Sequence, residues 1–381
     1  MLIPGFGGFD ALGAISYYNP KVVPIIRSAD ESTCVHFFPN LPSAAVATRA
    51  RSLMGWLGRR FERGVFSPDD ELHLVGHSTG GLDIRRLISI AICSPIADDE
   101  CAFGNRLRGS LRSAQFISTP HRGTQLAAHF DHRWMPVRVA PRLGYEAARA
   151  LTDVGMGLIG HAARLALRRR DTADWIDAAI DTATKVGPKR TALKRAEAVA
   201  TYFELLRWLR QMADDTNSVS DLSPRHATVI GRVPDMEEEH RRHADACHSS
   251  GIRLRSIVTV AKPPANPWGV FGLLHGLTAR GADTCRFPEM GEVAPLANGA
   301  AQTFAPAEND GIVNSLSMVW PEANRSQWVE ADNADVIGHY RSCEPEGSHG
   351  RQYDLLASDS EFCDITFRRV WTSVAEFTAR S

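Results

Sequence analysis

The stretch Leu74-Val75-Gly76-His77-Ser78-Thr79-Gly80-Gly81 decides the fold. It continues an apolar run that begins at Leu72 and leads into a helical pattern over 82–92, which predicts a strand, a sharp turn and a helix. A serine at such a turn needs small neighbours, because its backbone is strained and the helix passes close to the strand. An incidental serine in a glycine-rich turn is the simpler interpretation. The flanking strand and helix favour a nucleophilic Ser78 instead.

Two further apolar runs, Ala114–Ser118 and Leu254–Val260, have the length and composition of buried strands. A strand followed by a helix, repeated along the chain, is typical of a parallel sheet covered by helices. We therefore expect an α/β fold with a mostly parallel sheet and helices on both of its faces.

The middle of the chain has a different pattern. Between His132 and about Asp215, long helical stretches rich in Ala, Leu and Arg replace the alternation of strands and helices. This change predicts a helical cap or lid inserted into the sheet domain. The expected boundaries are 1–124 and 236–381 for the core and 125–235 for the cap.

Composition excludes several classes of protein. The 381 residues include 43 Lys+Arg and 44 Asp+Glu, for a net charge of -1, so no basic surface for nucleic acid is expected. Seven scattered cysteines predict reduced thiols. Charged residues interrupt every long apolar stretch, which excludes a transmembrane segment. The chain reaches Gly5 too early for a signal peptide, so a cytoplasmic location is expected unless a leader has been removed.

Four further segments carry a resemblance that extends along the chain. They are Ile3–Gly13, Ser118–Thr124, Asp221–Pro224 and Asn309–Val313. In this order around Ser78 they resemble the oxyanion loop, the Thr-Pro-His-x-Gly segment, the end of the lid and the catalytic-acid loop of bacterial lipases and esterases in the α/β-hydrolase superfamily. Pro4 stands where those lipases usually have histidine, which leaves the backbone donor of Phe6 available.

The resemblance implies roles for individual residues. The chain order in this fold is serine, acid, histidine, so Asp310 would be the catalytic acid, in a loop that follows an expected strand over Ala301–Phe304. A turn aspartate that binds its own backbone is the alternative for this Asn-Asp-Gly sequence. The backbone amides of Phe6 and Thr79 would form the oxyanion hole.

The general base does not follow from the sequence. The segment Val329–His339 resembles a lipase pattern that places the catalytic histidine at position 333, where this chain has Asn333. A carboxamide cannot take the serine proton near neutral pH. Three explanations stay open: the chain is a variant whose histidine was replaced, His339 acts through a different loop path, or the protein is an impaired hydrolase. His349 is a weaker candidate.

Metal and cofactor sites are not expected. Asp335 matches a position where several bacterial lipases bind calcium, but a salt bridge or a helix cap explains one carboxylate as well. The cluster of Glu and His residues over 237–248 matches no zinc spacing and is interpreted as a solvated, charged helix face.

Taken together, the residues and the resemblance predict a serine hydrolase that cleaves hydrophobic, lipid-like or oligomeric esters through an acyl-enzyme. An amidase or acyltransferase with the same chemistry is one alternative. A catalytically impaired binding protein on the same scaffold is the other, favoured by Asn333. The sequence defines neither the acyl chain nor the oligomeric state.

Overall fold

The computed structural model describes most of the chain outside its middle segment. The described residues are 1–5, 11–12, 15–41, 44–67, 69–93, 98–130, 217–224, 233–264, 270–285, 287–296, 299–340, 358 and 360–380.

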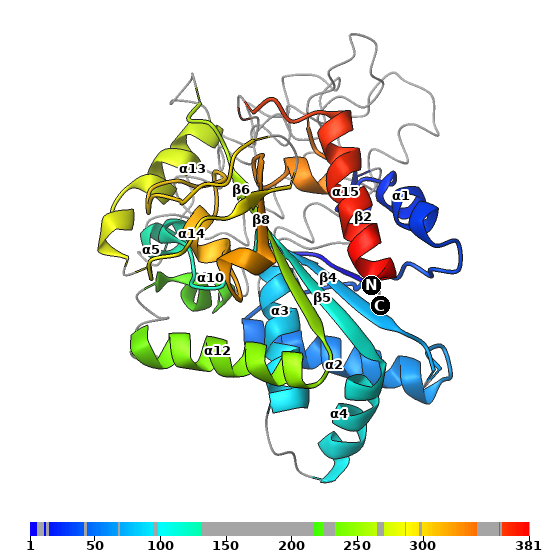
Figure 1. The fold of residues 1–381 in the computed structure, drawn as a ribbon. Coiled ribbons are helices and arrows are strands. Elements are labelled where there is room, and N and C mark those ends of the chain that lie inside the picture. The colour runs from blue at the N-terminus through cyan, green and yellow to red at the C-terminus, as the bar shows by residue number, and fades with distance from the viewer. Residues whose placement is uncertain are drawn as a thin grey trace, which may run out of the picture.

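A six-stranded sheet forms the centre of the molecule (Figure 1). Its strands, in spatial order, are β1 (Leu2–Ile3), β4 (Leu72–His77), β5 (Leu111–Ile117), β6 (Arg253–Val260), β8 (Ser326–Glu330) and β7 (Ala294–Pro295). All five pairings between them are parallel. Two short strands, β2 (Ala11–Leu12) and β3 (Ile15–Ser16), form a separate antiparallel pair.

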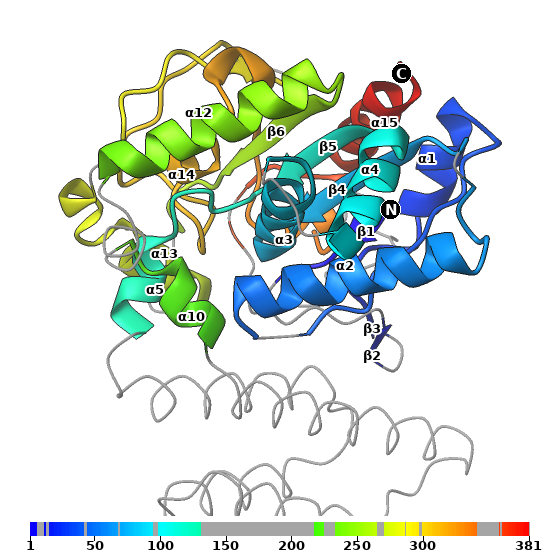
Figure 2. The ribbon, with the colours of Figure 1, turned by 90° about the horizontal axis from the view of Figure 1, so that it is seen from below.

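Helices cover both faces of this sheet (Figure 2). On one face lie α1 (Val22–Ala29) and α15 (Asp364–Ala379). The opposite face carries α2 (Val46–Glu62), α3 (Thr79–Ile88), α4 (Asp98–Ser110) and α12 (Val233–Ser249). The prediction of a mostly parallel sheet with helices on both faces, the architecture of an α/β-hydrolase core, is confirmed.

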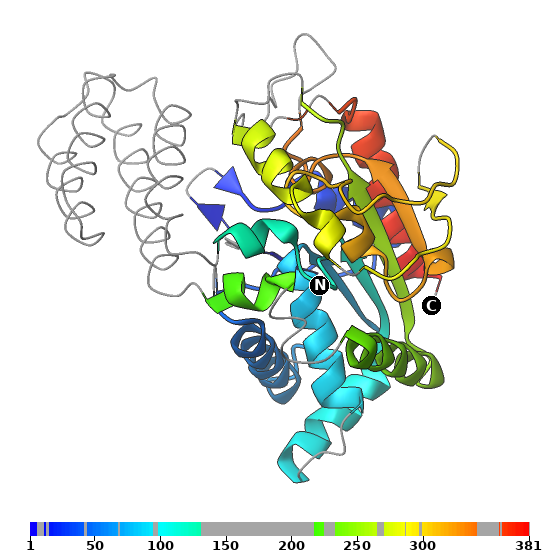
Figure 3. The same cartoon turned by 90° about the vertical axis from the view of Figure 1, so that its left-hand side faces the viewer.

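The remaining helices are short. Near the carboxyl ends of the strands, α5 (Gln125–Phe130), α10 (Asn217–Leu222) and α13 (Val270–Ala279) lie together (Figure 3). The others are α14 (Ser315–Met318), the π-helix η1 (Ser89–Cys93), and the 3-10 helices η2 (Ala282–Thr284), η3 (Ala323–Arg325) and η4 (Asp335–Ile337). No helix in the described ranges has the length and apolarity needed to cross a membrane.

Successive side chains of a strand point to opposite faces of the sheet, so each strand contributes to the hydrophobic core on both faces. Leu2 and Val75 belong to a buried cluster with Trp371 of α15, whereas Ile3 and Leu74 pack into a second cluster with α2 and α3. Because both faces are covered, the strands are apolar at successive positions rather than at every second one.

The strands predicted around Leu72, Ala114 and Leu254 correspond to β4, β5 and β6. The predicted solvated face over 237–248 is wrong for part of α12. His240, His243 and Cys247 are buried, because this side of the helix packs against η1 and β6. Glu238 and Arg241, on the same helix, are exposed.

Most of the predicted cap, 125–235, lies outside the described residues. Its two flanks are described and meet: the Thr124 amide donates to the Leu222 carbonyl oxygen at 2.9 Å. Gly123 has a φ of 79°, and a Cβ there would lie 2.5 Å from the same oxygen. The chain therefore leaves and re-enters the core at one point, while the cap's boundaries stay a prediction.

Candidate active site

Ser78 occupies the turn between β4 and α3. Its φ of 52° and ψ of -128° lie outside the regions that non-glycine residues usually adopt, at a cost of about 1–3 kcal/mol. Backbone hydrogen bonds hold this conformation: the Ser78 amide donates to the Ile117 carbonyl at 2.8 Å, and the Gly81 amide donates to the Ser78 carbonyl at 3.1 Å. Such a turn places a serine at the carboxyl edge of the sheet and at a helix start.

Two glycines make the turn possible. A Cβ at Gly80 would overlap the carbonyl oxygen of Ile3 and lie 2.7 Å from that of Pro4. A Cβ at Gly76 would lie 2.6 Å from the Gly81 nitrogen. The helix after Ser78 therefore packs directly against strands β4 and β1, which explains why the motif needs glycine on both sides of the serine.

The amino end of α3 faces the same turn. Thr79 is its first residue, and the first amides of a helix have no carbonyl partner within the helix. These donors favour an anion that forms beside Ser78. Phe6, the other predicted oxyanion donor, lies outside the described residues. Its neighbour Gly5 lies against the turn. A Cβ added at Gly5 would be only 2.7 Å from the Cβ of Ser78.

Asp310 lies beyond the end of β6, since the Ala261 amide that follows this strand donates to the Asn309 carbonyl at 3.0 Å. The Asp310 side chain is fully buried. Its Oδ1 accepts the amides of Ile312 and Val313 at 3.0 and 2.8 Å. Burial outweighs these hydrogen bonds and raises the pKa of Asp310 to about 6.

The segment before Asp310 differs from the prediction. The expected strand over Ala301–Phe304 is wrong: within it, only Gln302 forms a bridge, to Val293. The loop of Asp310 is therefore positioned by β6 rather than by a strand that directly precedes it.

Asn333 is the residue that the structure brings to Asp310. Its Nδ2 donates to Asp310 Oδ2 at 2.9 Å, and its amide donates to the Asp310 carbonyl at 3.1 Å. The first of these bonds is the one that a triad histidine makes through Nδ1–H. Asn333 thus makes this contact to the buried carboxylate while it lacks a basic nitrogen.

His339 is directed elsewhere. Its Nε2 donates to the carbonyl oxygen of Tyr17 at 3.0 Å, and the ring is buried. The contacts of Asp310 therefore favour position 333 over His339 as the position of the base. The third candidate, His349, lies outside the described residues.

His77 joins the two halves of the site. Its Nε2 donates to the Asn333 carbonyl at 2.9 Å, and its Nδ1 lies 2.6 Å from the Tyr17 hydroxyl. Burial lowers the pKa of His77 to about 3. Both ring nitrogens are engaged and the ring stays neutral, so this histidine holds the loop of Asn333 beside Ser78 instead of acting as a base.

Asp335 has protein partners of its own. Its Oδ2 accepts the Asp332 amide at 3.0 Å and the Ser360 hydroxyl at 2.7 Å, and the residue begins the helix η4. The N-cap position of η4 has no side-chain capping hydrogen bond, so these bonds do not bear out the expected helix cap at Asp335. Within the described part of the chain, no three His, Cys, Asp or Glu side chains come together as a metal site.

Three residues near the site were missed in the sequence. Thr259, at the end of β6, donates its hydroxyl to Asp310 Oδ2 at 2.7 Å. Tyr17 and Asn40 bind the backbone beside Gly5. No local pattern marks them, because each acts on a segment that is distant in the sequence.

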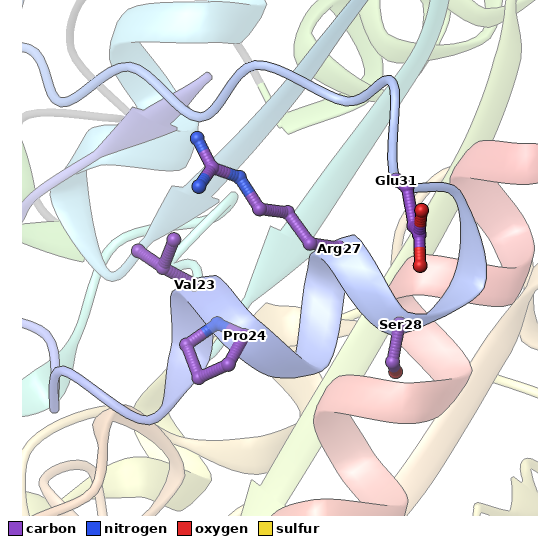
Figure 4. A pocket seen from close by; sticks show the side chains of 5 residues that line it. All are labelled: Val23, Pro24, Arg27, Ser28 and Glu31. Carbon is purple, nitrogen blue, oxygen red and sulfur yellow. The ribbon is translucent and has the colours of Figure 1, made fainter.

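A surface hollow of about 370 Å³ lies elsewhere, on α1 (Figure 4). It is lined by Val23, Pro24, Arg27, Ser28 and Glu31, none of which contributes to the contacts described above.

No protein-family model and no curated protein sequence matches the chain. Among solved structures, Staphylococcus hyicus lipase is 14% identical, with a TM-score of 0.48 over 100% of this chain and 94% of that one. Lipase 1 from Pelosinus fermentans is 13% identical, with a TM-score of 0.48 over 100% and 98%. EstA from Clostridium botulinum is 15% identical, with a TM-score of 0.46 over 100% and 86%. These values are too low to assign a family or an activity.

Proposed function

We propose that the protein is a serine hydrolase, lipase- or esterase-like, which acts on carboxylic esters with hydrophobic acyl groups. The observation that carries the proposal is the strained Ser78 at the start of α3, joined through His77 to the loop whose residue 333 binds the buried Asp310. This is the relative placement that a nucleophile, a base position and an acid need.

In the proposed reaction, the Ser78 hydroxyl attacks the ester carbonyl and the alcohol leaves, which gives an acyl-enzyme that water then hydrolyses. The amides of Thr79 and Phe6 stabilise the negative charge on the carbonyl oxygen. Both steps require a group that accepts a proton and returns it. Asn333 cannot do so; in this chain solvent water has to accept the Ser78 proton and return one to the leaving alcohol, and we expect this proton transfer to limit the rate.

A second candidate is a protein that binds esters without turning them over. The hydrogen bond from Asn333 Nδ2 to Asp310 favours it, because it fills the position of the base with a group that satisfies the acid and has no basicity. An amidase or acyltransferase would use the same acyl-enzyme and differ in the group that accepts the acyl chain. Product analysis with competing amine and alcohol nucleophiles distinguishes these activities.

The test uses p-nitrophenyl butyrate and a fluorophosphonate probe on the protein and on Ser78→Ala. The variant is expected to lose both hydrolysis and labelling. Ser89→Ala is the matched control, since Ser89 is similarly buried at the opposite end of α3 and should retain both. Hydrolysis that survives Ser78→Ala would contradict the proposal. Saturable binding of the ester without Ser78-dependent release of product would support the second candidate.

A further inference from the structure

The peptide group between Pro4 and Gly5 is held at both of its ends by buried side chains. Its carbonyl oxygen accepts a hydrogen bond from Asn40 Nδ2 at 3.0 Å. Its N–H donates to the Tyr17 hydroxyl at 2.7 Å. Because a peptide group is planar, two bonds at opposite ends fix the orientation of the whole plane.

Tyr17 connects this plane to the other half of the site. Its hydroxyl accepts from Gly5, so its own proton is donated to His77 Nδ1 at 2.6 Å. His77 must then carry its proton on Nε2, which donates to the Asn333 carbonyl at 2.9 Å. One continuous series of hydrogen bonds thus runs from Gly5 to the loop of residue 333.

Asn40 anchors the same plane to the helices. The second proton of its Nδ2 goes to Asp83 Oδ2 at 2.8 Å. Asp83, on α3, forms an ion pair with Arg49 of α2 at 2.8 Å, and both side chains are fully buried. The carbonyl side of the plane is therefore fixed by α3, the helix that follows Ser78, and by its neighbour α2.

The plane also contacts the proposed nucleophile. A Cβ at Gly5 would lie 2.7 Å from Ser78 Cβ and 2.8 Å from the Tyr17 hydroxyl oxygen, so this position has room only for glycine. Phe6, whose amide is the proposed oxyanion donor, follows directly in the sequence. A rotation of the Pro4–Gly5 plane would change where the chain enters Phe6.

We propose that Tyr17 and Asn40 are positioning residues that together clamp the Pro4–Gly5 peptide plane against Ser78 before the substrate binds. This inference rests on the proposed ester hydrolysis, in which the Phe6 amide that follows this plane is an oxyanion donor. It adds that the plane leading to that donor is held by side chains from two separate segments.

The test compares Tyr17→Phe with Tyr18→Phe. Tyr18 is the matched control because it is adjacent and buried, and its hydroxyl also forms a hydrogen bond with the backbone, by donating to the Ile3 carbonyl oxygen at 2.9 Å. Removing one oxyanion donor typically costs about 10²–10³-fold in kcat, and a displaced donor should cost roughly 10–100-fold. We expect Tyr17→Phe to lower kcat on p-nitrophenyl butyrate by that factor with KM little changed, and Tyr18→Phe to change neither strongly.

Asn40→Ala removes the hydrogen bond at the carbonyl end of the plane. It should also lower kcat, and the double variant with Tyr17→Phe should lose less than the product of the two single effects, because both bonds hold one rigid group. Equal losses in Tyr17→Phe and Tyr18→Phe would overturn the clamp. So would a loss in Tyr17→Phe that appears only in KM.

A second measurement does not depend on activity. The rate of hydrogen exchange at the Gly5 amide, followed by NMR, should rise in Tyr17→Phe and stay unchanged in Tyr18→Phe. If the protein shows no Ser78-dependent reaction, the proposed function fails, and Gly5 exchange alone decides the clamp. Faster exchange only in Tyr17→Phe supports it, and unchanged exchange overturns it.

Discussion

The turn around Ser78 and the loop around Asn333 place different demands on the sequence. At the turn, a side chain at Gly80 would collide with the backbone of β1, so the geometry depends on the identity of the residue. In the loop, position 333 is also held by its own amide and carbonyl, which bind Asp310 and His77. The loop can therefore change its side chain and keep its shape, whereas the turn cannot.

The largest expected effect tests the loop. Asn333→His introduces a base where the backbone already holds the position, and the new ring can donate to Asp310 as Nδ2 does now. General-base catalysis is typically worth about 10²–10⁴-fold, so kcat/KM on p-nitrophenyl butyrate should rise by a factor in that range.

The matched control exchanges the same two residue types at the other candidate position. His339→Asn removes a ring that binds the Tyr17 carbonyl. When it is combined with Asn333→His, the double variant should keep the increase in kcat/KM that Asn333→His produces alone. If His339→Asn alone abolishes an existing activity, while Asn333→His adds nothing, the base is at position 339 and the comparison of the two regions fails.

The next effect tests the turn. Gly80→Ala should lower the free energy of unfolding by about 4 kcal/mol and abolish the reaction of Ser78, because helix α3 must move away from β1. Gly109→Ala in α4 is the control, since no atom lies within 4 Å of the added methyl group and alanine favours a helix. Urea denaturation of both variants measures the difference. A stable and reactive Gly80→Ala protein would show that the turn tolerates what its geometry excludes.

The smallest effect concerns the acid that the loop binds. Burial raises the pKa of Asp310 to about 6 from an ordinary value of 3.8, so the folded protein holds this proton more tightly than the unfolded chain does. The contribution of Asp310 to the free energy of unfolding is fully present below pH 4 and is lost as the pH rises through 6. The pKa shift makes this contribution roughly 3 kcal/mol.

Asp310→Asn removes this dependence. The difference in free energy of unfolding between wild type and variant should fall between pH 4 and pH 6 and be constant above pH 7. Comparing differences cancels the contribution of Asp83, whose pKa burial also raises to about 6. The exposed Asp69→Asn should give a flat difference. A flat difference for Asp310→Asn would mean that Asp310 is ionised as easily in the fold as in water.

The turn could be predicted from sequence because its cause is local. An apolar strand, a serine between glycines and a helical pattern lie within about 20 residues, and the structure has each of them. The contact between Asn333 and Asp310 was anticipated only through resemblance, since the two residues are 23 positions apart in irregular loops.

The clamp on the Pro4–Gly5 plane could not be predicted in this way. Tyr17 and His77 are 60 residues apart, and His77 and Asn333 are 256 apart, so no periodic pattern connects them. The burial of the α12 histidines could not be predicted for a related reason. Neighbouring charged residues dominate that stretch of sequence, and only the packing of α12 against β6 and η1 shows which side of the helix is covered.

The hydrogen bond between Thr124 and Leu222 gives the molecule a modular organisation. A chain that departs and returns at one point can lengthen, shorten or be exchanged between those residues without pulling any strand out of register, and each doubling of such a loop costs only about 0.6 kcal/mol in closure entropy. Selection on the intervening segment is thereby separated from selection on the sheet that carries Ser78. Changes in the intervening segment can therefore accumulate on one side of this junction while the geometry around Ser78 is maintained on the other.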